Sequence, residues 1–187
     1  MAINLKTLSK PEGQRPIIAT LFGEGGMGKT TLASMFPKPV FIRTEDGTAS
    51  LVGNDNVSLF PLTTSSQDVL DAIEALATEK HDHKTLVIDS ITQLATQIES
   101  EIVESDPKAK SISQAGGGYG AGFGQASERH AQIREWAGSL AYEVGMNIVF
   151  IGHADTETLT LPDMDPYNRY CVRMHKKSIP HYTDNVD

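Results

Sequence analysis

Short, mostly apolar runs alternate along the chain with longer segments in which apolar residues recur every three or four positions. The short runs are typical of buried strands, and the longer segments predict helices with one buried face. Strands that alternate with helices in this way predict an α/β fold with a mostly parallel central sheet and helices on both faces. The predicted strands are 17–22, 40–43, 57–62, 85–88, 147–152 and 167–174. The predicted helices are 31–35, 69–77, 91–102 and 125–144.

The polar segments between these elements divide the chain into a lead-in, one domain and its loops. We expect residues 1–15 to be a polar lead-in segment and residues 16–187 to form the domain. Loop 107–124 is long and ends in a glycine-rich stretch, and loops of that length are usually functional or mobile. Segment 154–166 is predicted to be an acidic loop, whereas 178–187 gives no clear pattern.

Composition narrows the class of protein. A chain of 187 residues with 39% hydrophobic and 21% charged residues is typical of a soluble globular protein. The net charge of −8 argues against a surface that is basic throughout, so any nucleic-acid contact must be a local patch. Cys171 is the only cysteine, which excludes an internal disulfide and fits a reducing compartment. With no long apolar stretch either, we expect a cytoplasmic protein.

Residues 23–30 read GEGGMGKT and follow a predicted strand directly. They fit the P-loop pattern G-x-x-x-x-G-K-[ST] at every fixed position. The glycines let backbone N–H groups approach a polyphosphate, and the start of the next helix adds unpaired donors and a partial positive charge. Lys29 can reach the β- and γ-phosphates, whereas the alternative is a glycine-rich turn without a ligand. The expected nucleotide-binding residues are Gly23, Glu24, Gly25, Gly26, Met27, Gly28, Lys29, Thr30 and Thr31.

Two oxygen-bearing side chains are candidate Mg²⁺ ligands. The Thr30 hydroxyl completes the P-loop, and Asp89 follows the predicted strand 85–88, where a carboxylate can hold Mg²⁺ opposite the phosphates. The alternative for Asp89 is a cap of the next helix. Ser90 occupies the position where many P-loop ATPases carry a catalytic Glu, so a general base has to come from another strand.

Glu45 is the best candidate for that base, because it follows the strand after the P-loop helix. In a parallel sheet the carboxyl end of that strand lies beside the phosphate crevice, and a carboxylate there can orient or deprotonate the attacking water. Asp46 is the competing carboxylate, and a solvated turn is the alternative. His153 ends the strand 147–152 and is expected to face the γ-phosphate, unless it is simply a hydrogen-bonded histidine at a strand end.

The order of these motifs resembles the RecA-type ATPase core. VFIRTEDG, TLVIDSIT and IVFIGH resemble the segments that carry the catalytic Glu, the Walker-B Asp and the γ-phosphate sensor in that family. The nearest group is that of small phage-encoded RecA-like ATPases, some of which anneal single-stranded DNA. The resemblance covers residues 15–187 and implies a three-layer P-loop NTPase fold that uses ATP and Mg²⁺. Such a core normally continues with further strands, so the chain is either truncated at its C-terminus or a trimmed core.

The resemblance also implies partners. It implies a ring or filament of identical subunits with ATP between neighbours, and a basic residue that reaches across the interface. Arg173, Lys176 and Lys177 are the candidates, with a solvated basic strand end as the alternative.

The resemblance further implies DNA contact through two loops. Loop 107–124 carries lysines for phosphates and aromatic rings for bases, although a glycine-rich lid or a subunit contact would also fit. Loop 154–166 is acidic and would repel phosphates. The candidate DNA-binding residues are Lys108, Lys110, Tyr119 and Phe123. The acidic residues of the second loop are Asp155, Glu157, Asp163 and Asp165.

The sequence therefore supports an ATPase that acts on single-stranded DNA in recombination, annealing or repair, and whose turnover DNA stimulates. The alternative is an ATP-dependent oligomeric interaction module that binds no nucleic acid. A small-molecule kinase is disfavoured because no Arg-rich lid is evident, and a GTPase because no N-K-x-D motif occurs. His81 and His83 are spaced to share a metal, but a polar loop explains them better because no third ligand is near.

Overall fold

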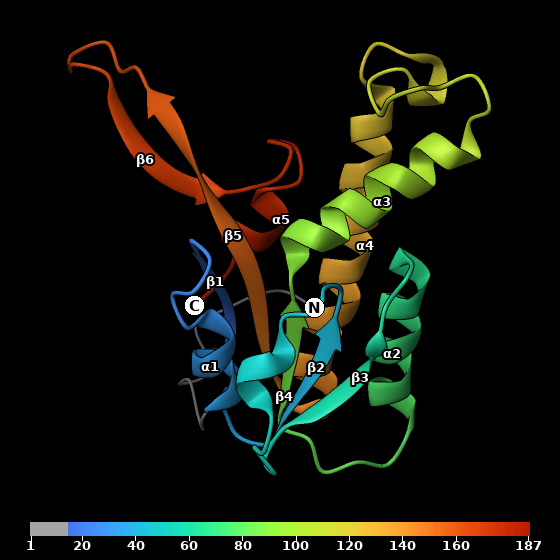
Figure 1. Ribbon diagram of the computed structural model, residues 1–187, viewed down its shortest axis with the longest axis vertical. Helices are drawn as coiled ribbons and strands as arrows, with labels where there is room; N and C mark the ends of the chain where they lie inside the picture. Colours follow the sequence, from blue (N-terminus) through green and yellow to red (C-terminus); the bar gives the residue numbers. More distant parts are fainter. Residues whose placement is uncertain (1–14) are drawn as a thin grey trace, which may run out of the picture.

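The computed structural model describes residues 15–187, and in this part of the chain a six-stranded sheet forms the centre (Figure 1). The order along the sheet is β1-β5-β4-β2-β3, with every neighbouring pair parallel, and β6 pairs antiparallel with β5. The predicted α/β fold with a mostly parallel sheet is confirmed. The strands are β1 Ile18–Gly23, β2 Pro39–Arg43, β3 Ser58–Leu62, β4 Thr85–Asp89, β5 Asn147–Leu159 and β6 Tyr167–Val172.

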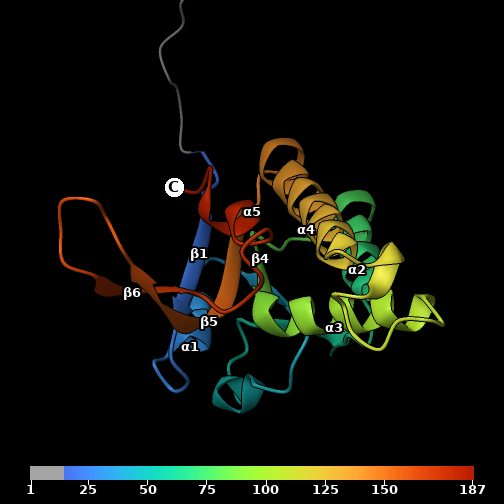
Figure 2. The same cartoon turned by 90° about the horizontal axis from the view of Figure 1, so that it is seen from above.

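Helices cover both faces of the sheet. Seen from above, α2, α3 and α4 lie together, well apart from α1 (Figure 2). The main helices are α1 Lys29–Ser34, α2 Ser66–Thr78, α3 Ile91–Ser105, α4 Ala121–Ser139 and α5 Pro180–Thr183. Shorter helical turns are η2 Thr48–Leu51, η3 Ala115–Gly117 and the π-helical turn η4 Leu140–Val144, which continues α4. None of the described helices is long and apolar enough to span a membrane.

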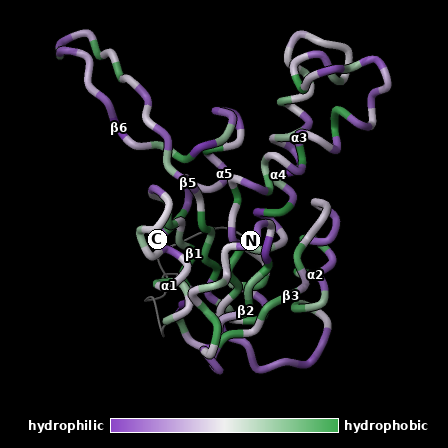
Figure 3. The backbone as a smooth tube through the Cα atoms, viewed as in Figure 1, coloured by the Kyte–Doolittle hydropathy of each residue, from purple (hydrophilic) through white to green (hydrophobic). Residues whose placement is uncertain are grey.

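Side chains of the central strands alternate between two cores, because successive residues of a strand point to opposite faces. The hydropathy colouring accordingly gathers its apolar shades on these strands (Figure 3). The larger core lies under α2, α3, α4 and α5 and includes Val40, Ile42, Leu86, Ile88, Ile148 and Phe150. The smaller core lies under α1 and η2 and includes Ala33, Phe41, Leu51, Val87, Val149 and Ile151.

Local polar signals start the two helices that flank β4. Ser65 caps α2 in a capping box, accepting from Asp68 N–H while the Asp68 carboxylate accepts from Ser65 N–H. Ser90 caps α3 by accepting a hydrogen bond from Gln93 N–H (3.2 Å). Because Ser90 makes that cap, the side chain of Asp89 is free for another role.

The acidic loop predicted at 154–166 is wrong over its first half, because β5 continues through Ala154 to Leu159 and pairs with β6. The pairing of β5 with β6 hydrogen-bonds the backbone groups that face the partner strand, while most side chains of this segment are polar, so the sequence shows no apolar alternation that would indicate a strand. The resulting arm, residues 154–172, projects from the sheet (Figure 1). A second projection, the α3–α4 tip (residues 106–120), rises on the other side, and α4 begins at Ala121, four residues before the predicted helix at 125–144.

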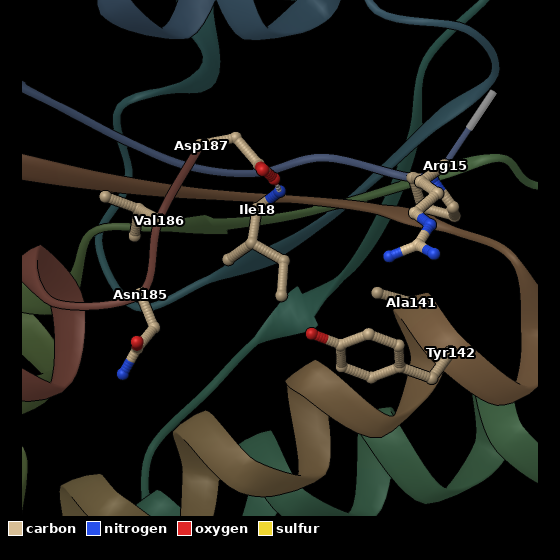
Figure 4. A pocket seen from close by; sticks show the side chains of 8 residues that line it. Arg15, Ile18, Ala141, Tyr142, Asn185, Val186 and Asp187 are labelled. Carbon is tan, nitrogen blue, oxygen red and sulfur yellow. Dashed lines mark hydrogen bonds between the residues drawn. The ribbon is translucent and has the colours of Figure 1, made fainter. Parts of the chain in front are cut away.

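The last ten residues, which gave no clear pattern, fold back onto the sheet. Tyr182 of α5 is fully buried, with its ring 5.0 Å from that of Phe150. At the end, Asp187 N–H donates to Ile18 O (2.9 Å) and the Asp187 carboxylate accepts from Ile18 N–H (2.9 Å). A cavity of about 440 Å³ lies between this segment, Tyr142 and Arg15 (Figure 4). The predicted lead-in at 1–15 lies outside the described residues, except for Arg15.

Candidate phosphate and metal site

The P-loop leaves β1 at Gly23 and leads into α1, as its sequence predicts. Gly26 and Gly28 adopt left-handed backbone angles, with φ of 78° and 82°, which only glycine adopts at little cost. Residues 25–31 line a pocket of about 300 Å³. Its other lining residues come from neighbouring strand ends and the turn after β2, namely Glu45, Gly47, Ser50, Asp89, Ile151 and His153.

Lys29 is held by the loop itself. Its Nζ donates to Gly23 O and to Glu24 O, each at 2.9 Å. These two predicted residues therefore contribute carbonyl groups to Lys29, while the remaining seven face the pocket. Because Lys29 also lines the pocket, a phosphate bound there can take over these hydrogen bonds.

Thr30 and Asp89, the two candidate metal ligands, are in direct contact. Thr30 Oγ1 donates to Asp89 Oδ2 at 2.8 Å, although the residues are far apart in sequence. Burial raises the pKa of Asp89, and the nearby Glu45 carboxylate raises it further, while the Thr30 hydroxyl opposes this. A buried carboxylate beside a hydroxyl is a donor set that fits Mg²⁺, and a cation there would offset the cost of burying the charge.

Glu45 and His153 meet across the pocket. His153 lies opposite Gly23 in the pairing of β5 with β1, and Glu45 lies just beyond the end of β2. His153 Nε2 and Glu45 Oε1 are 3.0 Å apart, and both side chains are about one-third exposed. Asp46 is exposed and lies outside the pocket lining, so the geometry favours Glu45 as the carboxylate that faces a bound phosphate.

The other predicted site residues do not line this pocket. Lys108, Lys110 and Tyr119 are exposed on the α3–α4 tip, whereas Phe123 lies in the first turn of α4 and stacks on His175 at 3.9 Å between ring centroids. His81 and His83 stack on one another, and among residues 15–187 no three His, Cys, Asp or Glu side chains cluster as a metal site.

The three basic candidates for an intersubunit contact come directly after β6 in the sequence. Arg173 donates to Ala154 O (3.1 Å) within its own chain, while Lys177 O accepts from Ser127 Oγ (3.0 Å) on α4. Lys176 is exposed and lines a separate cavity of about 530 Å³ at the base of the arm.

The sequence does not predict that Gly47 and Ser50 line the phosphate pocket, because a short polar turn carries no signal that it will fold toward the P-loop.

A parallel α/β sheet, a phosphate loop and acidic groups on the two adjacent strand ends together define the P-loop NTPase class. Residues 15–187 match the model of a family described as an AAA domain, and the chain belongs to that family of P-loop ATPases. A comparison with curated proteins found no match. Membership implies nucleotide binding and, in most such ATPases, the use of Mg²⁺.

Proposed function

We propose that this protein is a Mg²⁺-dependent ATPase of RecA type, related to the small phage-encoded RecA-like ATPases, that acts on single-stranded DNA. The observation that carries the ATPase part is the convergence of five side chains on one pocket from four separate elements. They are Lys29 and Thr30 of α1, Glu45 after β2, Asp89 of β4 and His153 of β5.

The roles follow from chemistry and position. The backbone N–H groups of the loop and the start of α1 bind the phosphates, and Lys29 exchanges its carbonyl partners for phosphate oxygens. Thr30 and Asp89 would hold Mg²⁺, which neutralises charge on the β- and γ-phosphates when bound. Glu45 accepts a proton from the attacking water as the water oxygen bonds to the γ-phosphorus and the bond from that phosphorus to the β,γ-bridging oxygen breaks, which releases ADP. His153 orients Glu45 through their 3.0 Å contact.

The α3–α4 tip supports contact with single-stranded DNA. Tyr119 is fully exposed, and Lys108 and Lys110 are exposed on the same tip. An aromatic ring free on both faces can stack on a base, and lysines can neutralise phosphates. Because Phe123 is already stacked on His175, the proposed base contact rests on Tyr119.

The exposed arm favours the second candidate, an ATP-dependent oligomeric interaction module without nucleic acid. Its acidic residues would repel a phosphate backbone, and only the Glu157–Arg169 pair (2.6 Å) offsets them within the two strands. In either case we propose a homo-oligomer. All three basic candidates for a contact across the interface are exposed, and Arg173 already donates to Ala154 O, which favours Lys176 and Lys177.

The ATPase proposal is tested by calorimetry and by phosphate release. Lys29→Ala should abolish detectable ATP binding, because it removes the cation at the mouth of the loop. Glu45→Gln should bind Mg-ATP like the wild type but hydrolyse it about 10²- to 10⁴-fold more slowly, the usual contribution of a general base. Asp46→Asn is the matched control and should keep wild-type turnover, whereas the reverse result would make Asp46 the base.

The DNA proposal is tested by turnover and by fluorescence anisotropy with single-stranded oligonucleotides at two salt concentrations. Binding that weakens with salt and stimulates turnover supports it, and Tyr119→Ala should weaken that binding about tenfold, the cost of losing one base stack. Tyr142→Ala, which changes another exposed tyrosine (82% exposed, against 109% for Tyr119) on η4, should not weaken it. ATP-dependent assembly without any response to DNA would select the interaction module instead.

A further inference from the structure

Thr44 lies directly before Glu45 and is almost completely buried, at 4% exposure. Its backbone N–H donates to Asp89 O (2.9 Å). Its hydroxyl makes two further contacts, donating to Ser90 O (2.7 Å) and accepting from Ser90 N–H (2.8 Å). The side chain of Thr44 thus hydrogen-bonds both backbone groups of Ser90, which is itself fully buried, and Ser90 O also accepts from Leu94 N–H (3.0 Å).

These contacts begin where the sheet ends. The paired register of β2 with β4 runs only as far as Arg43 and Asp89, so the residues beyond it have no further ladder of this kind to hold them together. The peptide bond between Asp89 and Ser90 is cis. Thr44, one residue before the proposed base Glu45, therefore connects the two strand ends by binding Ser90, which is one residue after the proposed metal ligand Asp89.

The third element that reaches this point is α3. Gln97 Nε2 donates to Thr63 O (3.1 Å) and Thr44 O (3.4 Å), which fixes the carbonyl side of Thr44 as well. Thr44 therefore has hydrogen bonds on its N–H, hydroxyl and carbonyl groups, all within the protein. Threonine suits the position because its branched side chain has few rotamers, so the hydroxyl is held in one direction.

We propose that Thr44 is a positioning residue for hydrolysis. Its hydroxyl holds the ends of β2 and β4 at a fixed separation, and this sets Glu45 relative to Asp89 and thereby the attacking water relative to the metal-bound phosphates. The inference rests on the proposed ATPase function. Displacing a catalytic group by about 1 Å can cost on the order of 10²-fold in rate, so a contact that reacts with nothing can still control turnover.

The experiment compares Thr44→Val, which keeps the shape and removes the hydroxyl, with Thr44→Ser, which keeps the hydroxyl. Thr85→Val is the matched control, because Thr85 is equally buried at the opposite end of β4 and its hydroxyl donates to Pro37 O (2.9 Å). Each variant is measured for kcat and KM, for ATP affinity with and without Mg²⁺ by calorimetry, and for melting temperature without ligand.

Thr44→Val should lower kcat at least about tenfold with KM changed less than about threefold, as expected when a reacting group is displaced and phosphate binding is kept. The gain in ATP affinity on adding Mg²⁺ should shrink as well. Thr44→Ser should keep about a third or more of wild-type kcat, while Thr85→Val should melt earlier but turn over normally.

Equal kcat values for Thr44→Val and Thr85→Val would overturn the proposal, as would a Thr44→Ser that is as slow as Thr44→Val. If Thr44→Val does not fold, Thr44→Ala replaces it, since its smaller side chain leaves room for a water molecule. If neither folds, the hydroxyl serves stability and the proposal fails. A wild-type protein that does not hydrolyse Mg-ATP would instead reject the ATPase function itself.

Discussion

His130 should make the protein acid-sensitive through its contact with the C-terminal segment. It lies on α4 at 1% exposure, and its Nδ1 is 2.9 Å from the hydroxyl of Tyr182. Burial, and then the neighbouring His181, lower the pKa of His130 from 6.5 to about 4. At neutral pH the imidazole is therefore uncharged in the native protein, and it shares a hydrogen bond with the hydroxyl of Tyr182, whose own pKa is raised by burial.

The sign and size of the effect follow from linkage. Because the native pKa is the lower one, the unfolded chain binds a proton first as the pH falls. The stability due to neutral His130 is thus complete above pH 6.5 and is lost as the pH falls toward 4. Between pH 7.5 and 4.5 this one group should remove about 2.5 kcal/mol from the free energy of unfolding, at about 1.4 kcal/mol per pH unit.

Urea denaturation of the wild type and of His130→Gln, at several pH values and constant ionic strength, isolates this contribution. Glutamine cannot titrate but can still hydrogen-bond Tyr182, and every other ionisable group is shared by the two proteins. Between pH 7.5 and 4.5 the variant should therefore lose about 2.5 kcal/mol less than the wild type. Parallel curves for the two proteins would refute the assignment of the low pKa to His130.

Two further predictions concern helix packing and the orientation of Glu45. Gly122→Ala should destabilise the protein by about 2 kcal/mol or more, because a Cβ at Gly122 would lie 2.3 Å from Ile112 O, and thermal melting measures this. Gly124→Ala, with nothing within 4 Å, should be neutral or stabilising; an equal loss in both would contradict the packing argument. His153→Ala should lower kcat about tenfold through the loss of its contact with Glu45, while His153→Gln, which can still donate, should lose less; identical rates in steady-state assays would exclude that role.

The features that could be predicted from the sequence are those with local signals. The P-loop fits a fixed spacing, and the buried strands are indicated by short runs of neighbouring apolar residues. The sequence also predicts that Glu45 and Asp89 line one pocket, because the carboxyl ends of parallel strands lie at the same edge of a sheet. These inferences needed only topology and no side-chain contact.

What could not be predicted depends on contacts between distant, polar residues. The paired segments of β5 and β6 in the arm have no apolar face, so the sequence pattern predicts a loop over residues 154–166. Tyr182 enters the core from a short helix whose neighbours are polar, and its partner His130 lies 52 residues away. The role of Thr44 depends on both backbone groups of Ser90 turning toward it, and the sequence around Thr44 does not encode that direction.

The two hydrogen bonds from Lys29 to the carbonyl groups of Gly23 and Glu24 have a consequence for selectivity. These contacts join the Lys29 ammonium group to the first two residues of the P-loop and so help to hold the conformation of the loop. An anion that binds Lys29 must displace these two carbonyl oxygens, and a single monovalent ion forms few other hydrogen bonds that would offset their loss. A polyphosphate can in addition bind several N–H groups along the loop, so we expect this site to select ligands by the number of their phosphate groups.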